Sequence, residues 1–297
     1  MNSPRALATA YEEARPRLVR VAYAVLGSTA EAEDVVADCW LRLVDADARE
    51  PVVDVLAWGV VAVGRRALDS LRSARNRRET YVGPWLPEPL IGAGAPGDPV
   101  DRVTLDEEVG FALMVALEAL TPAERTAWVL HDLFGLPFAE VATVVGRTPV
   151  AVRQLASRAR AHVEARAPRT TLDPATHAKV LQSFLAAAAG GDLGALVAVL
   201  DPDVVLTSDG GGQVSAARRP VVGADRVARF LLGVVGRWQP GQRVVLARVN
   251  GSLGFIVANG TVAHLVGALT VEGGRVTRID FVMPPEKLAR VAVPGTS

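Results

Sequence analysis

The spacing of the hydrophobic residues changes near Pro174, and this change constrains the fold more than any other feature of the sequence. Before Pro174, apolar side chains recur three and four residues apart, which is the period of an amphipathic helix. After a further helix-like segment, short β-branched runs are divided by two Asn-Gly pairs and a Gly-Gly pair, which is typical of an antiparallel meander. The sequence therefore predicts helical domains followed by an α+β domain.

Local start and stop signals divide the 297 residues into domains. Gly27 ends the first helix, which Pro16 is expected to kink or split. The "STAE" at residues 28–31 has the form of a capping box and opens a second helix that runs to about Val44. "DADAREP" is predicted to be a charged loop before a third helix that begins near Val53. We expect a helical domain at 1–80, a Pro/Gly-rich linker at 81–105, a second helical domain at 106–168 and an α+β domain at 175–297.

The linker contains a stiff segment, "YVGPWLPEPLIG", at residues 81–92, which we call the arm. Pro84, Pro87 and Pro89 fix their own φ and favour an extended residue before them, so a polyproline-like conformation is predicted. A flexible linker would be rich in Gly and Ser and would not place Trp85 among prolines. A stiff segment with an exposed aromatic side chain indicates that the arm docks against another part of the protein.

Composition excludes several classes of protein. The longest apolar run, near "VLAWGVVAVG", is far shorter than the roughly 20 residues of a transmembrane helix, and the N-terminus lacks a signal-peptide pattern. The one cysteine, Cys39, rules out an internal disulfide and favours a cytoplasmic location. The four histidines are scattered without the spacing of a metal site, so no metal and no cofactor are expected.

Positive charge gathers in two stretches, although the net charge is zero. Residues 65–78 hold six arginines and one acid, and residues 147–169 hold six arginines and one acid, so each stretch carries a charge of +5. Two such patches indicate binding to phosphate. Two solvated helix faces are the alternative, which is less favoured because each patch lies on a helix with features of DNA-binding proteins.

Residues 138–157, "FAEVATVVGRTPVAVRQLAS", have the pattern of a DNA-binding helix-turn-helix. Ala142 is the expected small residue at the helix crossing, and Gly146 is the expected turn glycine. Thr148 and Pro149 are expected to cap and begin the second helix. The first residues of that helix reach base edges in this motif, so the candidate base readers are Arg153, Gln154 and Ser157. The candidate phosphate contacts are Arg147, Arg158 and Arg160.

The two helical domains together resemble regions two and four of extracytoplasmic-function (ECF) sigma factors. The resemblance rests on "YEEARPRLVRVAYAVLGSTAEAEDVVADCWLRLV", on the basic helix after it, and on "LTPAERTAWVLHDLFGLPFAEVATVVGRTPVAVRQLASRAR", in the right order over residues 5–165. It implies a promoter-specificity subunit of bacterial RNA polymerase that has no catalytic chemistry of its own. The implied partners are bacterial core RNA polymerase and promoter DNA.

The resemblance also implies roles for particular residues. Residues 32–43 match the helix that binds the clamp coiled coil of the largest polymerase subunit, through Asp34, Asp38, Trp40 and Leu41. The loop at 45–54 and the helix at 58–78 match the part that captures the melted −10 element, through Arg65, Arg66, Asp69, Arg72 and Arg75. The helix-turn-helix matches the reader of the −35 element, through Arg147, Thr148, Arg153, Gln154, Ser157, Arg158 and Arg160.

The rest of the chain resembles a sigma factor subgroup with a fused SnoaL-like domain, a curved sheet wrapped by helices into a cone. "WLPEP" at 85–89 matches the linker motif of this subgroup, whereas its "DGGGK" is "DGGGQ" at 209–213 and its "NPDKL" is "PPEKL" at 284–288. Contacts of the missing lysine and asparagine are therefore in doubt. We expect the arm to dock near the glycine loop, where glycines allow a close approach, and thereby to regulate the protein in cis. The expected regulatory residues are Trp85, Leu86, Pro87, Glu88, Pro89, Asp209, Gly210, Gly211 and Gly212.

Other functions stay open. SnoaL-like cones include isomerases and cyclases that use an acid or a histidine, for which Asp209, His264 and Asp280 are the candidates. Strict alternation places His264 on a face that would line the cone, but no compact acid–base group emerges. A small-molecule ligand in the cone is a stronger alternative than catalysis. A polymerase-independent helix-turn-helix regulator is the third, although it leaves the first basic helix unexplained.

Overall fold

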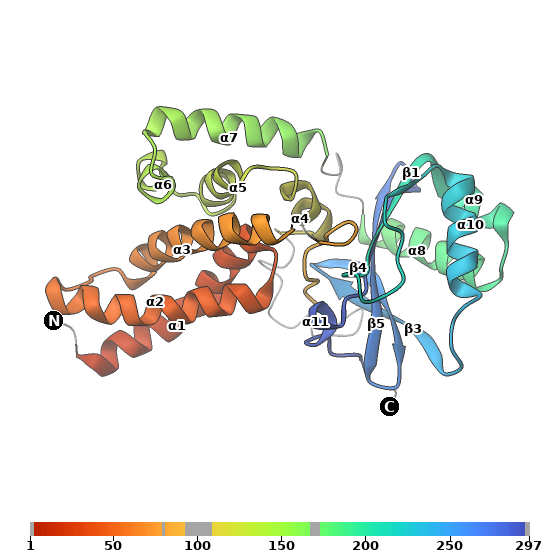
Figure 1. The fold of residues 1–297 in the computed structure, drawn as a ribbon, viewed down its shortest axis with the longest axis horizontal. Coiled ribbons are helices and arrows are strands. Elements are labelled where there is room, and N and C mark those ends of the chain that lie inside the picture. The colour runs from red at the N-terminus through yellow and green to blue at the C-terminus, as the bar shows by residue number, and fades with distance from the viewer. Residues whose placement is uncertain (1–2, 79–80, 93–108, 167–172, 295–297) are drawn as a thin grey trace. The chain divides into compact units, whose positions relative to one another are not determined.

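The computed structural model describes residues 3–78, 81–92, 109–166 and 173–294. The chain divides into two compact units, one of Met1–Glu79 with Ala116–Arg166 and one of Thr80–Val115 with Ala167–Ser297. The described part of the first unit is helical, and the second unit combines a sheet with helices (Figure 1). The predicted class of helical domains plus an α+β domain is therefore confirmed.

Three long helices begin the first unit: α1 (Pro4–Leu26), α2 (Thr29–Arg49) and α3 (Val55–Arg78). Gly27 ends α1 with a φ of 76°, in the left-handed region that favours glycine. Ser28 then caps α2, because its hydroxyl accepts a hydrogen bond from the Glu31 N–H at 3.3 Å. The buried stripe of α1, which includes Leu7, Tyr11 and Leu18, lies within the unit's core.

Two expectations about these helices need correction, because α2 is longer than expected and α1 is not split. Residues 45–49 are the last turn of α2 rather than a loop. Asp47 is buried there and accepts a hydrogen bond from the Val52 N–H at 2.9 Å, so this acid caps a structural turn instead of facing solvent. α1 also runs unbroken through Pro16. A proline costs a helix interior about 3 kcal/mol, and each large apolar side chain buried along α1 stabilises it by about 1.5–3 kcal/mol.

Shorter helices follow: α4 (Phe111–Leu117), α5 (Pro122–Trp128), the π-helix η1 (Val129–Leu133), α6 (Phe138–Val145) and α7 (Pro149–Glu164). Thr121 and Glu124 form the reciprocal capping box that "TPAE" predicts before α5. Arg125 of α5 is buried, and its Nε donates a hydrogen bond to the carbonyl oxygen of Ala24 in α1 at 3.1 Å. The early and late helices thus share one packed unit.

The second unit contains a six-stranded sheet in the order β2-β1-β6-β5-β4-β3. The strands are β1 (Leu200–Asp209), β2 (Val221–Val222), β3 (Gln242–Val249), β4 (Ser252–Asn259), β5 (Val262–Glu272) and β6 (Arg275–Val282). β3 to β6 form the predicted antiparallel meander, with Asn250 (φ 45°) and Gly251 (φ 80°) in the first turn. β1 pairs with β6 in parallel.

Each face of the sheet has its own hydrophobic core. Helices α8 (Pro174–Ala189), α9 (Leu193–Val199) and α10 (Ala224–Val235) cover one face, where Phe184 and Leu231 pack against the strands (Figure 1). The short helix α11 (Pro285–Leu288) contributes to the other core, which contains Leu86 of the arm. The arm is therefore part of the second unit's hydrophobic core.

Candidate functional sites

α6 and α7 form the helix-turn-helix. α6 ends at Gly146, whose φ of 70° is left-handed and whose N–H donates to the Ala142 carbonyl oxygen at 3.0 Å. Ala142 is buried, as the crossing of the two helices requires. Thr148 precedes α7 and accepts a hydrogen bond from the Ala151 N–H at 3.2 Å, and Pro149 is the first helical residue. The glycine and the cap thus fix the turn that orients α7.

α7 turns a basic face to solvent. Its buried side chains recur at helical spacing on the opposite face and are Val152, Ala156, Ala159 and Val163. Every residue expected to contact the −35 element is exposed: Arg147, Thr148, Arg153, Gln154, Ser157, Arg158 and Arg160. An exposed, basic second helix is the arrangement with which helix-turn-helix proteins enter the major groove.

Two of these arginines pair with acids of the preceding helices. The Nε of Arg158 lies 3.0 Å from Oε1 of Glu124, and the Nε of Arg160 lies 2.9 Å from Oδ1 of Asp132. Burial raises the pKa of Glu124, but hydrogen bonds from Thr121 and Arg158 lower it by more, so the net pKa is lowered. The hydrogen bond and charge of Asp132 raise the pKa of Arg160. The two arginines are exposed enough to meet a phosphate, whereas the side chains of Glu124 and Asp132 are only 17% and 13% exposed. A phosphate that took over an arginine would therefore leave a largely buried carboxylate without its cation.

The residues expected at the −10 element lie on α3. The Nη2 of Arg65 donates to the carbonyl oxygen of Thr143 in α6 at 2.8 Å. The Nη2 of Arg66 lies 3.3 Å from Oδ2 of Asp38, so a candidate DNA contact and a candidate polymerase contact meet between α2 and α3. A polar cavity of about 360 Å³ lies there. The remaining expected contacts are Arg72 and Asp69, which pair at 3.4 Å, and Arg75, whose side chain lies outside the described residues.

The residues expected to bind core polymerase lie on α2. Asp34 and Asp38 are exposed, and the side chain of Leu41 is 68% exposed. Trp40 is half-buried, and its ring centroid lies 5.3 Å from that of Tyr11 in α1. Asp34, Asp38 and Leu41 are four and three residues apart, so they share one exposed face of α2, a mixed surface of two carboxylates and one apolar side chain. Trp40 also packs α2 against α1 through its ring contact with Tyr11.

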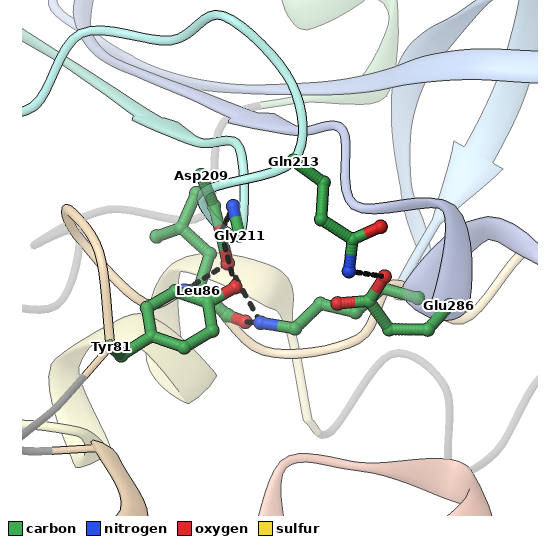
Figure 2. A network of polar contacts seen from close by, with 7 residues as sticks. Tyr81, Leu86, Asp209, Gly211, Gln213 and Glu286 are labelled. Carbon is green, nitrogen blue, oxygen red and sulfur yellow. Dashed lines mark hydrogen bonds and ion pairs between the residues drawn. The ribbon is translucent and has the colours of Figure 1, made fainter.

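The structure brings the arm and the glycine loop together at Asp209, the last residue of β1 (Figure 2). The carboxylate of Asp209 is fully buried. Its Oδ1 accepts hydrogen bonds from the Tyr81 hydroxyl at 2.7 Å and from the Gly211 N–H at 3.0 Å. Its Oδ2 accepts one from the Leu86 N–H at 2.9 Å and pairs with Nζ of Lys287 at 2.7 Å. This arrangement, the Asp209 node, satisfies a buried charge with two groups of the arm, one of the loop and one of α11.

Lys287 links α11 to the arm a second time. Its Nζ also donates to the Leu86 carbonyl oxygen and lies 4.0 Å from the centroid of the Trp85 ring, a cation–π contact. The altered motifs also meet, because Nε2 of Gln213 donates to Oε2 of Glu286 at 3.3 Å (Figure 2). Gln213 therefore makes a polar contact of its own where the subgroup motif has lysine.

The other end of the arm pairs with β3, the edge strand of the sheet. The Asn250 N–H donates to the Leu90 carbonyl oxygen at 2.8 Å, and the Leu90 N–H donates to Oδ1 of Asn250 at 3.0 Å. The Gly92 N–H donates to the Arg248 carbonyl oxygen at 3.1 Å. Between this bond and those of Leu90, Ile91 lies opposite Val249 in an antiparallel bridge. The arm therefore covers part of an open sheet edge. Trp85 is half-buried, and the residues buried along the arm are Leu86, Pro87, Glu88 and Pro89.

Glycines are required in the loop after Asp209 for two different reasons. A Cβ on Gly210 would lie 2.3 Å from the Val214 carbonyl oxygen, which is a severe clash with the backbone. Gly211 (φ 62°) and Gly212 (φ 72°) have left-handed backbones. A Cβ on Gly212 would also lie 3.1 Å from a side-chain carbon of Val82 in the arm. The loop thus accommodates the arm at short range.

Sequence reasoning missed three residues of this contact: Tyr81, Asn250 and Lys287. Lys287 lies in the "PPEKL" motif and Tyr81 begins the arm, so both were visible but had no assigned partner. Asn250 was interpreted only as a turn residue. Its side chain nevertheless accepts from the arm and donates to the Val109 carbonyl oxygen at 3.2 Å.

The candidates for catalysis do not form a site among the described residues. Asp280 is buried, which raises its pKa, and it pairs with Arg278 at 2.7 Å. His264 is exposed and does not line the cone, contrary to expectation. Val266, with which alternation groups His264, belongs to the core that contains Leu86 rather than to the core beneath the helices. The β4–β5 ladder also has a bulge at His264, where it passes from Val257–Leu265 to Ala258–Ala263. The apolar cavity beneath α8 and α10 measures about 60 Å³, well below the roughly 300–1,000 Å³ of ligand pockets.

None of the helices in the described part of the chain has the length and hydrophobicity of a membrane span. The same part of the chain holds no cluster of three or more His, Cys, Asp or Glu side chains arranged for a metal ion.

Comparison with known proteins identifies both helical segments. Residues 10–77 match the family "Sigma-70 region 2", and residues 110–163 match "Sigma-70, region 4". The ECF RNA polymerase sigma factor SigJ of Mycobacterium tuberculosis is 43% identical over 93% of this chain and 91% of its own. The probable ECF RNA polymerase sigma factor SigI of the same organism is 36% identical over 95% of this chain and 94% of its own.

A crystal structure of M. tuberculosis SigJ shares the fold. It superposes with a TM-score of 0.76 and 40% identity, covering 95% of this chain and 98% of that one. The chain belongs to the ECF RNA polymerase sigma factors, a family without enzymatic activity whose members bind core RNA polymerase and promoter DNA to direct transcription initiation.

Proposed function

We propose that the C-terminal domain regulates this sigma factor in cis by holding the arm. In the sequence, the arm lies between region 2, which ends at residue 77, and region 4, which begins at residue 110. The observation that carries the proposal is the Asp209 node, in which a fully buried carboxylate of the C-terminal domain binds a hydroxyl and a backbone N–H of the arm.

The contact is specific rather than a general hydrophobic association. A buried carboxylate without partners is strongly disfavoured, so the arm and Lys287 are both needed to satisfy Asp209. At the other end, Asn250 bonds the Leu90 backbone in both directions. Side chains that bind backbone groups at two separate points fix the register of the arm as well as its position.

Holding the arm gives the C-terminal domain control over the connection between the two DNA-binding regions. A docked arm has a fixed course, whereas release leaves residues 81–92 able to change their course. Because region 2 and region 4 must meet two promoter elements at once, the state of the arm changes how readily both are engaged. The C-terminal domain would then act as a built-in regulator.

The surfaces described above supply the rest of the function. In this proposal α7 reads the −35 element, the arginines of α3 bind the melted −10 strand, and the mixed surface of α2 binds core polymerase, with the cytoplasm as the place of action. Arg65 and Arg66 currently bond groups within the first unit, so DNA would replace those partners. The interaction that each arginine would give up is exposed to solvent, so replacing it with a contact to DNA costs little free energy.

Transcription in vitro tests the proposal. Core polymerase is combined with the wild-type protein or with the Asp209→Asn variant, on a library of genomic fragments. We expect discrete start sites only when the protein is present, and a changed transcript yield with Asp209→Asn. Asp225→Asn is the matched control, because Asp225 forms an exposed pair with Arg229 on the same domain.

Two outcomes would contradict the proposal at different levels. Equal transcript yields from the wild type and Asp209→Asn would exclude regulation by the arm without affecting the conclusion that the protein is a sigma factor. Tight binding to a duplex site without polymerase, with no initiation, would instead favour an independent helix-turn-helix regulator.

A further inference from the structure

Val150, the second residue of α7, is an apolar side chain that the fold does not use. It is 62% exposed, although it follows directly on the cap and first proline of the recognition helix. A β-branched residue is also a poorer helix former than alanine, so helix stability does not explain valine at this position.

Its place on the helix is the informative feature. Successive helical residues are about 100° apart, so Val150, Gln154 and Ser157 lie within about 60° of one another. This stripe lies opposite the buried side chains Val152 and Ala156 and is therefore the outermost line of α7. Arg153 and Arg158 flank the stripe on its two sides.

An uncharged stripe between two arginines suits a helix inserted in the major groove. On this helix Arg158 is the expected phosphate contact on one side of the stripe, and Arg153 lies on the other side as an expected base reader beside Gln154 and Ser157, so the central stripe would face base edges. In that groove the apolar group on a base edge is the 5-methyl group of thymine. The N-terminal residues of the recognition helix approach the bases, and Val150 is the most N-terminal member of the stripe.

We propose that Val150 is a specificity-determining residue that recognises a thymine in the −35 element through contact with the 5-methyl group. The inference rests on the proposed role of α7 at this element. Gln154 and Ser157, one and two turns further along, would contact neighbouring bases by hydrogen bonds, so Val150 adds an apolar position to the readout.

Removal of the methyl group from the DNA tests this directly. Initiation by the reconstituted holoenzyme is measured at fixed salt on one promoter found in the genomic library. Each thymine of its −35 element is replaced in turn by deoxyuridine, which lacks only the 5-methyl group. Burial of one methyl group corresponds to about a fourfold effect, so we expect about a fourfold loss at one position with the wild-type protein.

The Val150→Ala variant removes the protein side of the same contact, so the two changes together form a double-mutant cycle. The variant should initiate about fourfold less well on the thymine template and show no further loss with deoxyuridine at that position. Val262→Ala, a change at a 58% exposed valine of the C-terminal domain, should respond to deoxyuridine as the wild type does.

Three results would overturn the assignment. The first is tolerance of deoxyuridine at every −35 thymine, and the second is an equal deoxyuridine effect in Val150→Ala. The third is a −35 element made only of G·C pairs. In all three results the holoenzyme still initiates transcription. Failure of the sigma function would appear instead as an absence of start sites. That failure would overturn both the assignment of Val150 and the proposed role of α7.

Discussion

Replacing Lys287 by methionine is expected to release the arm, because it leaves the buried carboxylate of Asp209 without its cation. Asp209 is 0% exposed and the side chain of Lys287 only 10%, with 2.7 Å between the charged atoms. Removing one partner of such a pair costs about 3–5 kcal/mol. The hydroxyl and N–H groups that still bond Asp209 place the cost at the lower end, about 3 kcal/mol. Methionine keeps a long unbranched side chain but removes the positive charge, including its contact with the Trp85 ring.

Hydrogen exchange at the arm measures this cost. The Leu86 N–H is bonded to Asp209, so it exchanges only when the arm opens. A loss of 3 kcal/mol corresponds to about a 150-fold faster exchange. The matched control is Arg229→Met, which removes the cation of an exposed pair and is expected to change exchange by about twofold. Exchange at Leu86 within threefold of the wild-type rate in Lys287→Met would refute the reasoning.

Further predictions concern packing and titration. Gly210→Ala is expected to lower the midpoint of urea unfolding of the C-terminal domain, because the new Cβ would clash with the Val214 carbonyl oxygen at 2.3 Å. Gly233→Ala has open space around the new Cβ, so it should raise the free energy of unfolding by about 0.5–1 kcal/mol. Arg125→Ala should destabilise the helical unit by about 3–5 kcal/mol in the same assay. Burial raises the pKa of the Cys39 thiol to about 11 from 9.0, so its contribution to stability is complete below about pH 9 and is lost as the pH rises towards 11. Urea unfolding at several pH values should show a steeper loss for the wild type than for Cys39→Ala.

Features that depend on a few adjacent residues could be predicted from the sequence. Thr121 and Thr148 begin helices because their side chains reach N–H groups three residues later. Gly146 ends a helix because its own backbone is left-handed. The Asn-Gly pairs likewise specify hairpins, so the meander followed from local pattern alone. The candidate −35 residues came from the same helix-turn-helix pattern, and the structure places them on one exposed face.

Features that depend on distant residues could not be predicted in this way. Asp209 and Lys287 are 78 positions apart, and Tyr81 lies 128 positions before Asp209. The motifs of the subgroup indicated that the arm and the glycine loop belong together, but not which side chains join them. His264 shows another limit, because alternation groups it with Val266, and only the three-dimensional structure shows that Val266 packs with Leu86 and Leu288 rather than beneath the helices. The parallel pairing of β1 with β6 also had no local signal.

A reversible lock on the arm tests the central claim most directly. Ile91 and Val249 are paired across the arm and β3 without mutual hydrogen bonds, the geometry in which backbones approach closely enough for a disulfide. In the Ile91→Cys/Val249→Cys variant, oxidation before addition of core polymerase fixes the arm, and reduction releases it. A second pair, Val205→Cys/Val222→Cys at the opposite edge of the sheet, controls for the presence of a disulfide. The native Cys39 is buried and does not compete.

Transcript yield from the oxidised and reduced forms of the same protein is the measurement. If docking of the arm regulates initiation, the locked form differs in yield from the reduced form, and in the direction opposite to Asp209→Asn. The control pair shows no such difference. Equal yields from the locked and released forms would contradict the claim that the C-terminal domain acts through the arm.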